Sequence, residues 1–237
     1  MKKVVIITDN TNLYTLFKVR ILPLPLHDVT FTYYCSPGNR HLFNNEIEEI
    51  SLKKDYSLFV IDCHLVISLH CQQVFPAELI DSVRCINVHP GLNPHNRGWY
   101  PHIFCIMNGK PAGATIHEID YKIDHGPIIA SRQVEVLSWD TSETLYQRII
   151  EAELQMLKEH LVSIINNNYS PLQINEPGNY NSKNDFKSQC QIDMQEVGTF
   201  EQFYNKMRAL SFTGYKNAWF VDKDGNKVYL NLKITKQ

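Results

Sequence analysis

Short apolar runs alternate with amphipathic stretches through the first half of this 237-residue chain. Four runs have the composition and length of strands: VVIIT (4–8), VTFTYY (29–34), SLFVID (57–62) and CINV (85–88). The stretches between them, residues 11–22, 42–54 and 76–83, are each long enough for a crossover helix. Because parallel neighbours in a sheet must be joined by such crossovers, the pattern predicts a mostly parallel, Rossmann-like α/β sheet.

The pattern changes after Gly109. GATIHEID (113–120) and GPIIASRQVEV (126–136) are strand-like but lie too close together for a crossover, so we expect them to be antiparallel and to extend the sheet. Asp140 and Glu143 then have the D-x-x-E spacing of a capping box. Apolar residues recur at helical spacing from Leu145 to Ile164, which predicts one long amphipathic helix.

The remainder of the chain is more polar. Residues 166–185 are rich in turn formers, and we expect a loop there. Residues 200–210 have a helical pattern, and strand-like runs at 215–221 and 227–234 flank a turn with an Asp-Gly pair. We therefore divide the chain into a main domain, 1–170, and a small C-terminal α+β region, 171–237, that ends in a β-hairpin. This hairpin is too small to bury its aromatic side chains alone, which predicts a homodimer.

Composition narrows the class of protein. The formal net charge is -2 and no cluster of Lys and Arg stands out, so we expect no nucleic-acid partner. No apolar run approaches the ~20 residues that cross a bilayer, and the N-terminus resembles a strand, which predicts a cytoplasmic protein without a membrane partner. The 6 cysteines include no C-x-x-C pair and are typical of reduced core thiols.

The polar residues of interest follow the fourth strand, in CINVHPGLNPHNRGWYPHIF. Side chains alternate along a strand, so Asn87 and His89 project together while Val88 points into a core. In open α/β sheets, ligands bind beyond the carboxyl ends of the strands, and an amide beside an imidazole suits acyl transfer. The alternative is that Asn87 completes a turn and His89 only packs.

A second motif lies further along the chain, in IDYKIDHGPIIASRQVEV. Asp124 precedes Gly126 and Pro127, where a tight turn could bring its carboxylate to the same crevice. Alone, Asp124 is more typical of an Asx turn than of a catalytic carboxylate. Together, however, N-x-H-P-G and I-D-H-G-P-I resemble the signature of the 10-formyltetrahydrofolate-dependent formyltransferases, and the resemblance extends over roughly residues 1–170.

That resemblance implies three catalytic roles. Asn87 would donate a hydrogen bond to the developing oxyanion, His89 would assist proton movement or stabilise that oxyanion, and Asp124 would orient or charge His89. The chemistry is consistent, because a neutral amine that attacks a formyl carbon creates a tetrahedral oxyanion and must lose a proton. A histidine near its natural pKa suits both tasks.

The resemblance also implies a folate pocket. The stretch VISLHCQQVFPAELI is similar to the family segment that lines it, so the candidates for folate contact are Ile67, Leu69, Phe75 and Ile123. The alternative for each is plain core packing. We expect no metal, and we assign the other histidines to surface or loop positions: His64, His70, His95, His102, His117 and His125.

Within the family, the phrase R-G-W-Y-P after the catalytic histidine most resembles the sugar N-formyltransferases, and DNTNLYTLF after the first strand fits the same subgroup. The acceptor implied is an amino sugar on a nucleoside diphosphate. Its candidate contacts are Asn10, Arg97, Trp99, Tyr100, Tyr180 and Tyr215. Their alternatives are structural: helix capping, loop anchoring and surface exposure.

The expected function is therefore transfer of a formyl group from 10-formyltetrahydrofolate to a 3-amino or 4-amino dideoxy sugar linked to a nucleotide, dTDP being the expected carrier. Such sugars enter bacterial surface polysaccharide, including lipopolysaccharide O-antigen. A methionyl-tRNA formyltransferase would carry a larger, basic second domain, whereas only about 70 residues follow Ile165 here. Two alternatives stay open: a hydrolase that deformylates the folate, and a catalytically silent folate or nucleotide-sugar binding protein.

Overall fold

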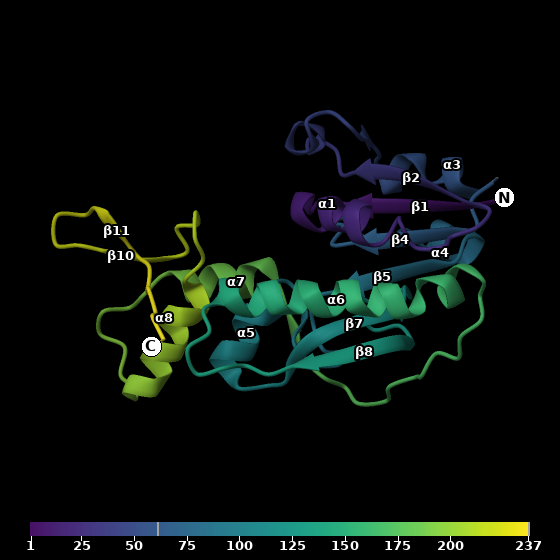
Figure 1. The fold of residues 1–237 in the computed structure, drawn as a ribbon. Coiled ribbons are helices and arrows are strands. Elements are labelled where there is room, and N and C mark those ends of the chain that lie inside the picture. The colour runs from purple at the N-terminus through teal and green to yellow at the C-terminus, as the bar shows by residue number, and fades with distance from the viewer. Residues whose placement is uncertain (61, 237) are drawn as a thin grey trace.

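The computed structural model describes residues 1–60 and 62–236. Its centre is a seven-stranded sheet in the order β3-β2-β1-β4-β5-β7-β8. The strands are β1 (Lys2–Thr8), β2 (Val29–Cys35), β3 (Glu48–Glu49), β4 (Leu65–Leu69), β5 (Cys85–His89), β7 (Ala112–Glu118) and β8 (Ile128–Val134). The first five are parallel, and β7 and β8 are antiparallel to their neighbours. The prediction of a mostly parallel sheet with an antiparallel extension is confirmed (Figure 1).

Helices join and cover these strands. α1 (Thr11–Arg20) follows β1, α4 (Ala77–Ser82) links β4 to β5, and α5 (Pro101–Asn108) precedes β7. α6 (Ser142–Ile165) packs along β7 and β8 and closes the larger hydrophobic core, whose residues come from alternate positions of the strands and from α6. A smaller core on the opposite face contains Val66 and Leu79. The central strands are buried on both faces, as strands of parallel sheets usually are.

Two predicted elements between β2 and β4 are wrong. Ser57–Val60 is the short helix α3 rather than a strand, and Ile61 of that prediction lies outside the described residues. The third strand is β4, because the LVISL run can be buried on both faces whereas SLFV is too short to distinguish helix from strand. The crossover helix at 42–54 is also wrong: η1 (Arg40–Phe43), β3 and α2 (Leu52–Asp55) occupy the region, and Asn44 and Asn45 interrupt it with positive φ.

The start of α6 differs by one residue from the predicted capping box. Thr141 is the N-cap and exchanges side-chain hydrogen bonds with Thr144. The Asp140 carboxylate is occupied elsewhere, since it accepts a hydrogen bond from the backbone N–H of Leu137 (2.7 Å) and pairs with Arg148. Both arrangements satisfy free N–H groups at the helix start, and the observed one also anchors the preceding loop.

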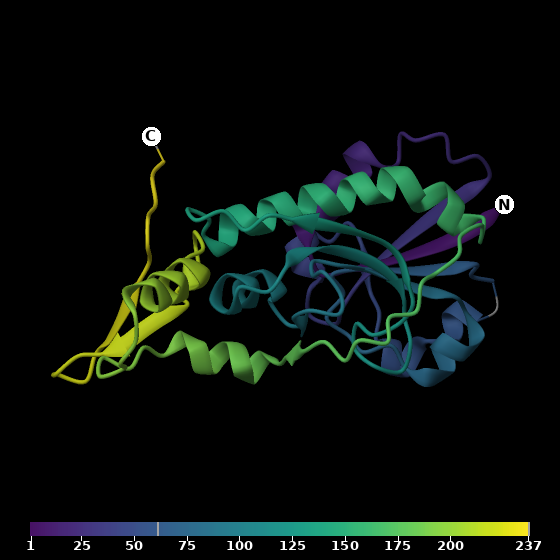
Figure 2. The same ribbon diagram turned by 90° about the horizontal axis from the view of Figure 1, so that it is seen from below.

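The C-terminal region has the predicted helix and hairpin. α8 (Phe200–Leu210) is followed by β10 (Ala218–Val221) and β11 (Lys227–Leu230), which pair antiparallel. α7 (Lys183–Cys190) was not predicted, nor was the short pairing of β6 (Arg97–Gly98) with β9 (Tyr180–Asn181). Figure 2 shows the long segment after α6 crossing the side of the sheet away from α6 before it reaches α7.

Two negative findings concern the described residues. No helix among them combines the length and the apolar character that a membrane crossing requires. Within residues 1–60 and 62–236, no three His, Cys, Asp or Glu side chains are grouped as metal ligands would be.

Candidate active site

Asn87 and His89 project from the same face of β5, as their spacing predicts. Val88 between them is fully buried in the core that α6 covers. β5 pairs with β7 so that Asn87 lies opposite His117 and His89 lies opposite Thr115. His89 is only 4% exposed, because this face of the sheet is covered by the loop that follows the strand. Gly91 in that loop lies so close to the His89 ring that no side chain fits there.

Asp124 reaches the same place from the loop between β7 and β8. Its φ of 49° is left-handed, a conformation that aspartate tolerates better than most residues. The loop is fixed on both sides of the carboxylate, because the Asn93 side chain donates to the carbonyl of Asp124 (2.9 Å) and Gly126 packs directly on the carbonyl of Glu118. A tight turn therefore places this carboxylate beside β5.

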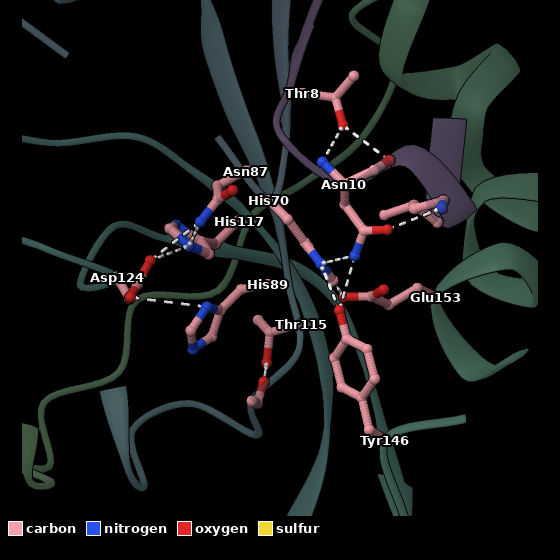
Figure 3. A network of polar contacts seen from close by, with 12 residues as sticks. Thr8, Asn10, His70, Asn87, His89, Thr115, His117, Asp124, Tyr146 and Glu153 are labelled. Atoms are coloured by element: carbon pink, nitrogen blue, oxygen red, sulfur yellow. Dashed lines mark hydrogen bonds and ion pairs between the residues drawn. The ribbon is translucent and has the colours of Figure 1, made fainter. Parts of the chain in front are cut away.

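The structure brings the three predicted catalytic side chains together (Figure 3). Asp124 Oδ1 accepts a hydrogen bond from Asn87 Nδ2 (2.9 Å), and Asp124 Oδ2 lies 3.6 Å from Nδ1 of His89. The backbone N–H of Gly98 donates to Oδ2 (3.0 Å). With the Nδ1 proton of His89 facing the carboxylate, the other ring nitrogen is free to accept a proton.

The buried setting controls the charges of the pair. Burial lowers the pKa of His89 to about 4, although the Asp124 carboxylate opposes this effect. Burial would raise the pKa of Asp124, but His89, His117 and the Gly98 N–H outweigh it and hold that pKa well below its usual range. Nε2 of His89 is buried and has no hydrogen-bond partner among the described residues. At neutral pH the site therefore combines a carboxylate with a neutral imidazole whose acceptor nitrogen is unoccupied.

Two histidines assigned to the surface or to loops are in fact buried on regular elements, so that assignment is wrong for His102 on α5 and His117 on β7. His117 Nε2 lies 3.3 Å from Asn87 Nδ2 and 3.5 Å from Asp124 Oδ1, and its Nδ1 lies 2.6 Å from the carbonyl of Glu118. His117 belongs to this site because it lies opposite Asn87 in the antiparallel pair of β5 and β7, and directly opposed residues share a face. The hydrophobic pattern of the sequence does not give the register of that pair, so His117 was not predicted.

The four folate candidates lie in different surroundings. Ile67 and Leu69 are fully buried in the core against α6. Phe75 is 8% exposed and belongs to the core on the opposite face, the face from which Asn87 projects. Ile123 is 48% exposed, directly before Asp124. Of the four, only Ile123 presents a large apolar surface to solvent.

The candidate acceptor contacts that follow β5 are each in contact with residues after α6. Arg97 Nη2 donates to the carbonyl of Pro177 (3.1 Å), and Lys183 Nζ lies 3.7 Å from the centre of the Trp99 ring. The Tyr100 ring packs on Phe186 with centroids 4.3 Å apart. These contacts tie the R-G-W-Y-P phrase to the segment after α6.

Asn10, Tyr180 and Tyr215 lie apart from one another in the sequence and in their contacts. Asn10 is the N-cap of α1 and also donates from Nδ2 to the Tyr146 hydroxyl (2.7 Å). Tyr180 is 44% exposed and packs on Gly98, whereas Tyr215 is 64% exposed with its ring 5.2 Å from that of Phe212.

Both parts of the chain match known protein families. A family model described as "Formyl transferase" matches residues 2–161, and one described as "N-formyltransferase dimerization C-terminal domain" matches residues 185–236. A dTDP-4-amino-4,6-dideoxyglucose formyltransferase from Mycobacterium tuberculosis is 48% identical over 170 residues, which cover 72% of this chain and 73% of that protein.

Solved structures agree in fold. A 4-N formyltransferase from Francisella tularensis has a TM-score of 0.95 and 39% identity, with 100% of this chain and 99% of that chain covered. An N-formyltransferase from Helicobacter canadensis, solved with folinic acid and dTDP-3-aminofucose, has a TM-score of 0.75 and 23% identity, with 92% and 84% covered. At that identity the likeness concerns the fold, and it shows that a protein of this fold binds a folate.

The lowered pKa of His89 predicts a pH dependence of stability. Above about pH 6.5 the histidine is neutral in both the folded and the unfolded chain, so it has no effect there. As the pH falls from 6.5 toward 4, the unfolded chain binds a proton that the folded chain refuses, and the free energy of unfolding falls by on the order of 3 kcal/mol. Chemical denaturation across this range should show a shallower fall for His89→Asn than for the wild type; equal slopes would contradict the burial effect.

Proposed function

We propose that this chain, which belongs to the formyl transferase family and is a sugar N-formyltransferase, uses 10-formyltetrahydrofolate as its formyl donor. The proposed acceptor is the amine of a dTDP-linked 4-amino-4,6-dideoxy sugar. The observation that carries the proposal is the convergence of Asn87, His89 and Asp124 at the carboxyl end of β5. The named acceptor of the M. tuberculosis relative favours the 4-amino over the 3-amino sugar. Surface polysaccharide synthesis and a cytoplasmic location remain predictions from the sequence.

In the proposed mechanism His89 takes the proton that the attacking amine must lose. Its unpartnered Nε2 is the acceptor, and the Asp124 carboxylate stabilises the imidazolium that forms. Because burial disfavours that imidazolium, the charge on Asp124 matters more here than it would in water. The protonated ring can then donate to the folate nitrogen as it leaves.

Asn87 supports the oxyanion that forms on the formyl oxygen. In the free protein one of its amide hydrogens is directed to Asp124 Oδ1, and the other lies within reach of His117 Nε2. One of these bonds must therefore be given up when the oxyanion is bound. The bond to His117 is the longer, at 3.3 Å, and is the one we expect to yield.

We retain the residues predicted from the sequence as the acceptor and folate contacts. Arg97, Trp99 and Tyr100 lie in the loop directly beyond the catalytic strand and belong to the acceptor side, as do Asn10, Tyr180 and Tyr215. Phe75 belongs to the core on the face of the sheet that carries Asn87, and Ile123 is exposed directly before Asp124, which supports a folate contact for both. Ile67 and Leu69 would act through their backbone, because their side chains are buried in the opposite core.

The test of function is incubation of purified protein and 10-formyltetrahydrofolate with dTDP-4-amino-4,6-dideoxyglucose, its 3-amino counterpart and glycinamide ribonucleotide. Mass spectrometry should show one added formyl group on the 4-amino sugar. Release of formate at the same rate without any acceptor would instead support the hydrolase. Formylation of the glycinamide ribonucleotide alone would overturn the sugar assignment.

The role of Asp124 can be separated from a structural one. Asp124→Asn should lower turnover by ~10²- to 10⁴-fold while substrate binding persists, because His89 loses its charged partner. His89→Asn should have a comparable effect, and the double variant should be no worse than the worse single one, since the two act as a unit. Asp120→Asn, the same change in the same loop at a residue paired with His125, is the matched control. Wild-type turnover in folded Asp124→Asn would remove Asp124 from the catalytic residues.

The C-terminal region supports a homodimer, since residues 185–236 match a dimerization domain. Large apolar side chains are exposed there, with Val197 at 95% and Phe200 at 86%. Light scattering of the purified protein should therefore give twice the mass of the chain. Phe200→Glu should shift the population toward monomer, whereas Val19→Glu, at an exposed apolar residue of α1, should not. A monomeric wild type at micromolar concentration would contradict the dimer.

A further inference from the structure

A fully buried carboxylate lies on the core side of α6. Glu153 has no exposed surface, and the residues around it on the helix, such as Leu154 and Leu157, belong to the hydrophobic core. Its Oε1 lies 2.8 Å from Nε2 of His70, and its Oε2 has no partner among the residues that the structure describes. Burying a carboxylate with a single hydrogen-bond partner costs more free energy than that bond returns, so stability does not explain this residue.

His70 connects Glu153 to the end of the sheet. It directly follows β4 and has a left-handed φ of 57°. Its other ring nitrogen, Nδ1, lies 3.1 Å from Asn10 Nδ2 and 3.1 Å from the Tyr146 hydroxyl. His70, Asn10, Tyr146 and Glu153 form one network at the ends of β1 and β4 (Figure 3).

The orientation of the Asn10 amide decides where the His70 proton resides. Asn10 Oδ1 accepts a hydrogen bond from the backbone N–H of Leu13 (3.0 Å), as the N-cap of α1, so its NH₂ group must face His70 and Tyr146. An amide NH₂ can only donate, and Nδ1 of His70 must therefore be the acceptor. The proton of the neutral ring is then on Nε2, where it is donated to Glu153.

One hydrogen remains unused in this network. Asn10 Nδ2 donates to the Tyr146 oxygen (2.7 Å), and Asn10 Nδ2 and the Tyr146 hydroxyl both lie 3.1 Å from Nδ1 of His70, whose single lone pair can take only one of their hydrogens. When Asn10 occupies that lone pair, the hydroxyl hydrogen of Tyr146 is the one left over. The Tyr146 hydroxyl hydrogen can rotate. The Tyr146 ring packs on two others, with its centroid 4.7 Å from that of His102 and 6.2 Å from that of Phe212. Burial raises the pKa of Tyr146, so the hydroxyl keeps its hydrogen at neutral pH.

This free donor lies at the edge of the sheet that holds the catalytic trio. β1, β4 and β5 are adjacent and parallel, so Asn10, His70 and His89 all follow or end strands at the same carboxyl edge. Figure 3 shows both clusters in one view, with Tyr146 on the α6 side and Asp124 on the other. Asn10, His70 and Tyr146 are half-buried, whereas Glu153 is fully buried behind them.

We propose that Glu153 is a positioning residue: it holds the His70 proton on Nε2, keeps Nδ1 an acceptor for Asn10, and leaves the Tyr146 hydroxyl free to donate to an oxygen of the amino-sugar nucleotide. The inference rests on the proposed function for the identity of that ligand. It adds Tyr146 to the acceptor-binding side chains, and Glu153 and His70 as the residues that fix its direction.

Steady-state kinetics with dTDP-4-amino-4,6-dideoxyglucose tests the ligand contact. Tyr146→Phe and Glu153→Gln should each raise the KM for the sugar nucleotide about fivefold, the effect of one neutral hydrogen bond, while the KM for the folate is unchanged. The double variant should stay near fivefold, because both changes remove the same bond. The matched control is Glu151→Gln, the same change on the same helix at an exposed carboxylate paired with Arg20.

Thermal unfolding separates positioning from structural support. Glu153→Gln should unfold at the wild-type temperature or above it, because a buried charge is removed. If Glu153→Gln unfolds at a lower temperature than the wild type and its KM for the sugar equals that of Glu151→Gln, the proposal is overturned and Glu153 is a structural residue.

A substrate-free measurement keeps this inference distinct from the proposed function. Long-range ¹H–¹⁵N correlation spectra of the labelled protein, assigned with His70→Gln, report which ring nitrogen carries the proton. A proton on Nε2 in the wild type, redistributed in Glu153→Gln but not in Glu151→Gln, is the expected result, and a proton on Nδ1 would overturn the inference. If the wild type formylates no nucleotide amino sugar, the proposed function fails and the ligand assigned to Tyr146 fails with it, whereas the tautomer result is unaffected.

Discussion

The buried carboxylate of Asp124 is the contact on which the active-site arrangement depends. Its oxygens meet three groups from two separate segments: the Asn87 amide and the His89 ring on β5, and the Gly98 N–H of β6. A buried charge must be satisfied by several donors, so each segment is held in place by its bond to the same group. The left-handed backbone at Asp124 and the tight packing of Gly126 are local consequences of aiming one carboxylate at three partners.

The β6 contact extends this dependence to a distant part of the chain. Arg97 and Trp99 donate backbone hydrogen bonds to the 179–181 segment, from Arg97 N to Asn179 O and from Trp99 N to Asn181 O (both 2.9 Å). The connection after α6 therefore crosses the sheet and braces the loop that supplies Gly98 to Asp124. Because α7 follows that connection directly, the region matched by the dimerization family begins close to the loop that carries Gly98.

The sequence predicted what depends on local pattern and missed what depends on register and distance. Alternation on β5 was enough to place Asn87, His89 and Val88 on their correct faces, and helical spacing was enough for α6 and α8. His117 could not be found this way, because its position opposite Asn87 follows from the pairing of β5 with β7. The same holds for Glu153, whose partner His70 is 83 residues away. The misplaced strand at 57–62 is a different failure, in which a short apolar run suits a helix and a strand equally well.

Two polar clusters thus lie at the same carboxyl edge of the sheet, and their buried polar groups are satisfied in different ways. Around Asp124, several donors face one charge, and Nε2 of His89 has no hydrogen-bond partner among the described residues and can accept a proton. Around Glu153, the hydrogens of Asn10 and Tyr146 outnumber the acceptors that they face, which leaves one hydrogen unused. Amine attack on a formyl group needs one site that accepts a proton and another that holds the acceptor by its oxygens. The roles proposed for His89 and Tyr146 would supply these two functions at the edge where open α/β sheets bind their ligands.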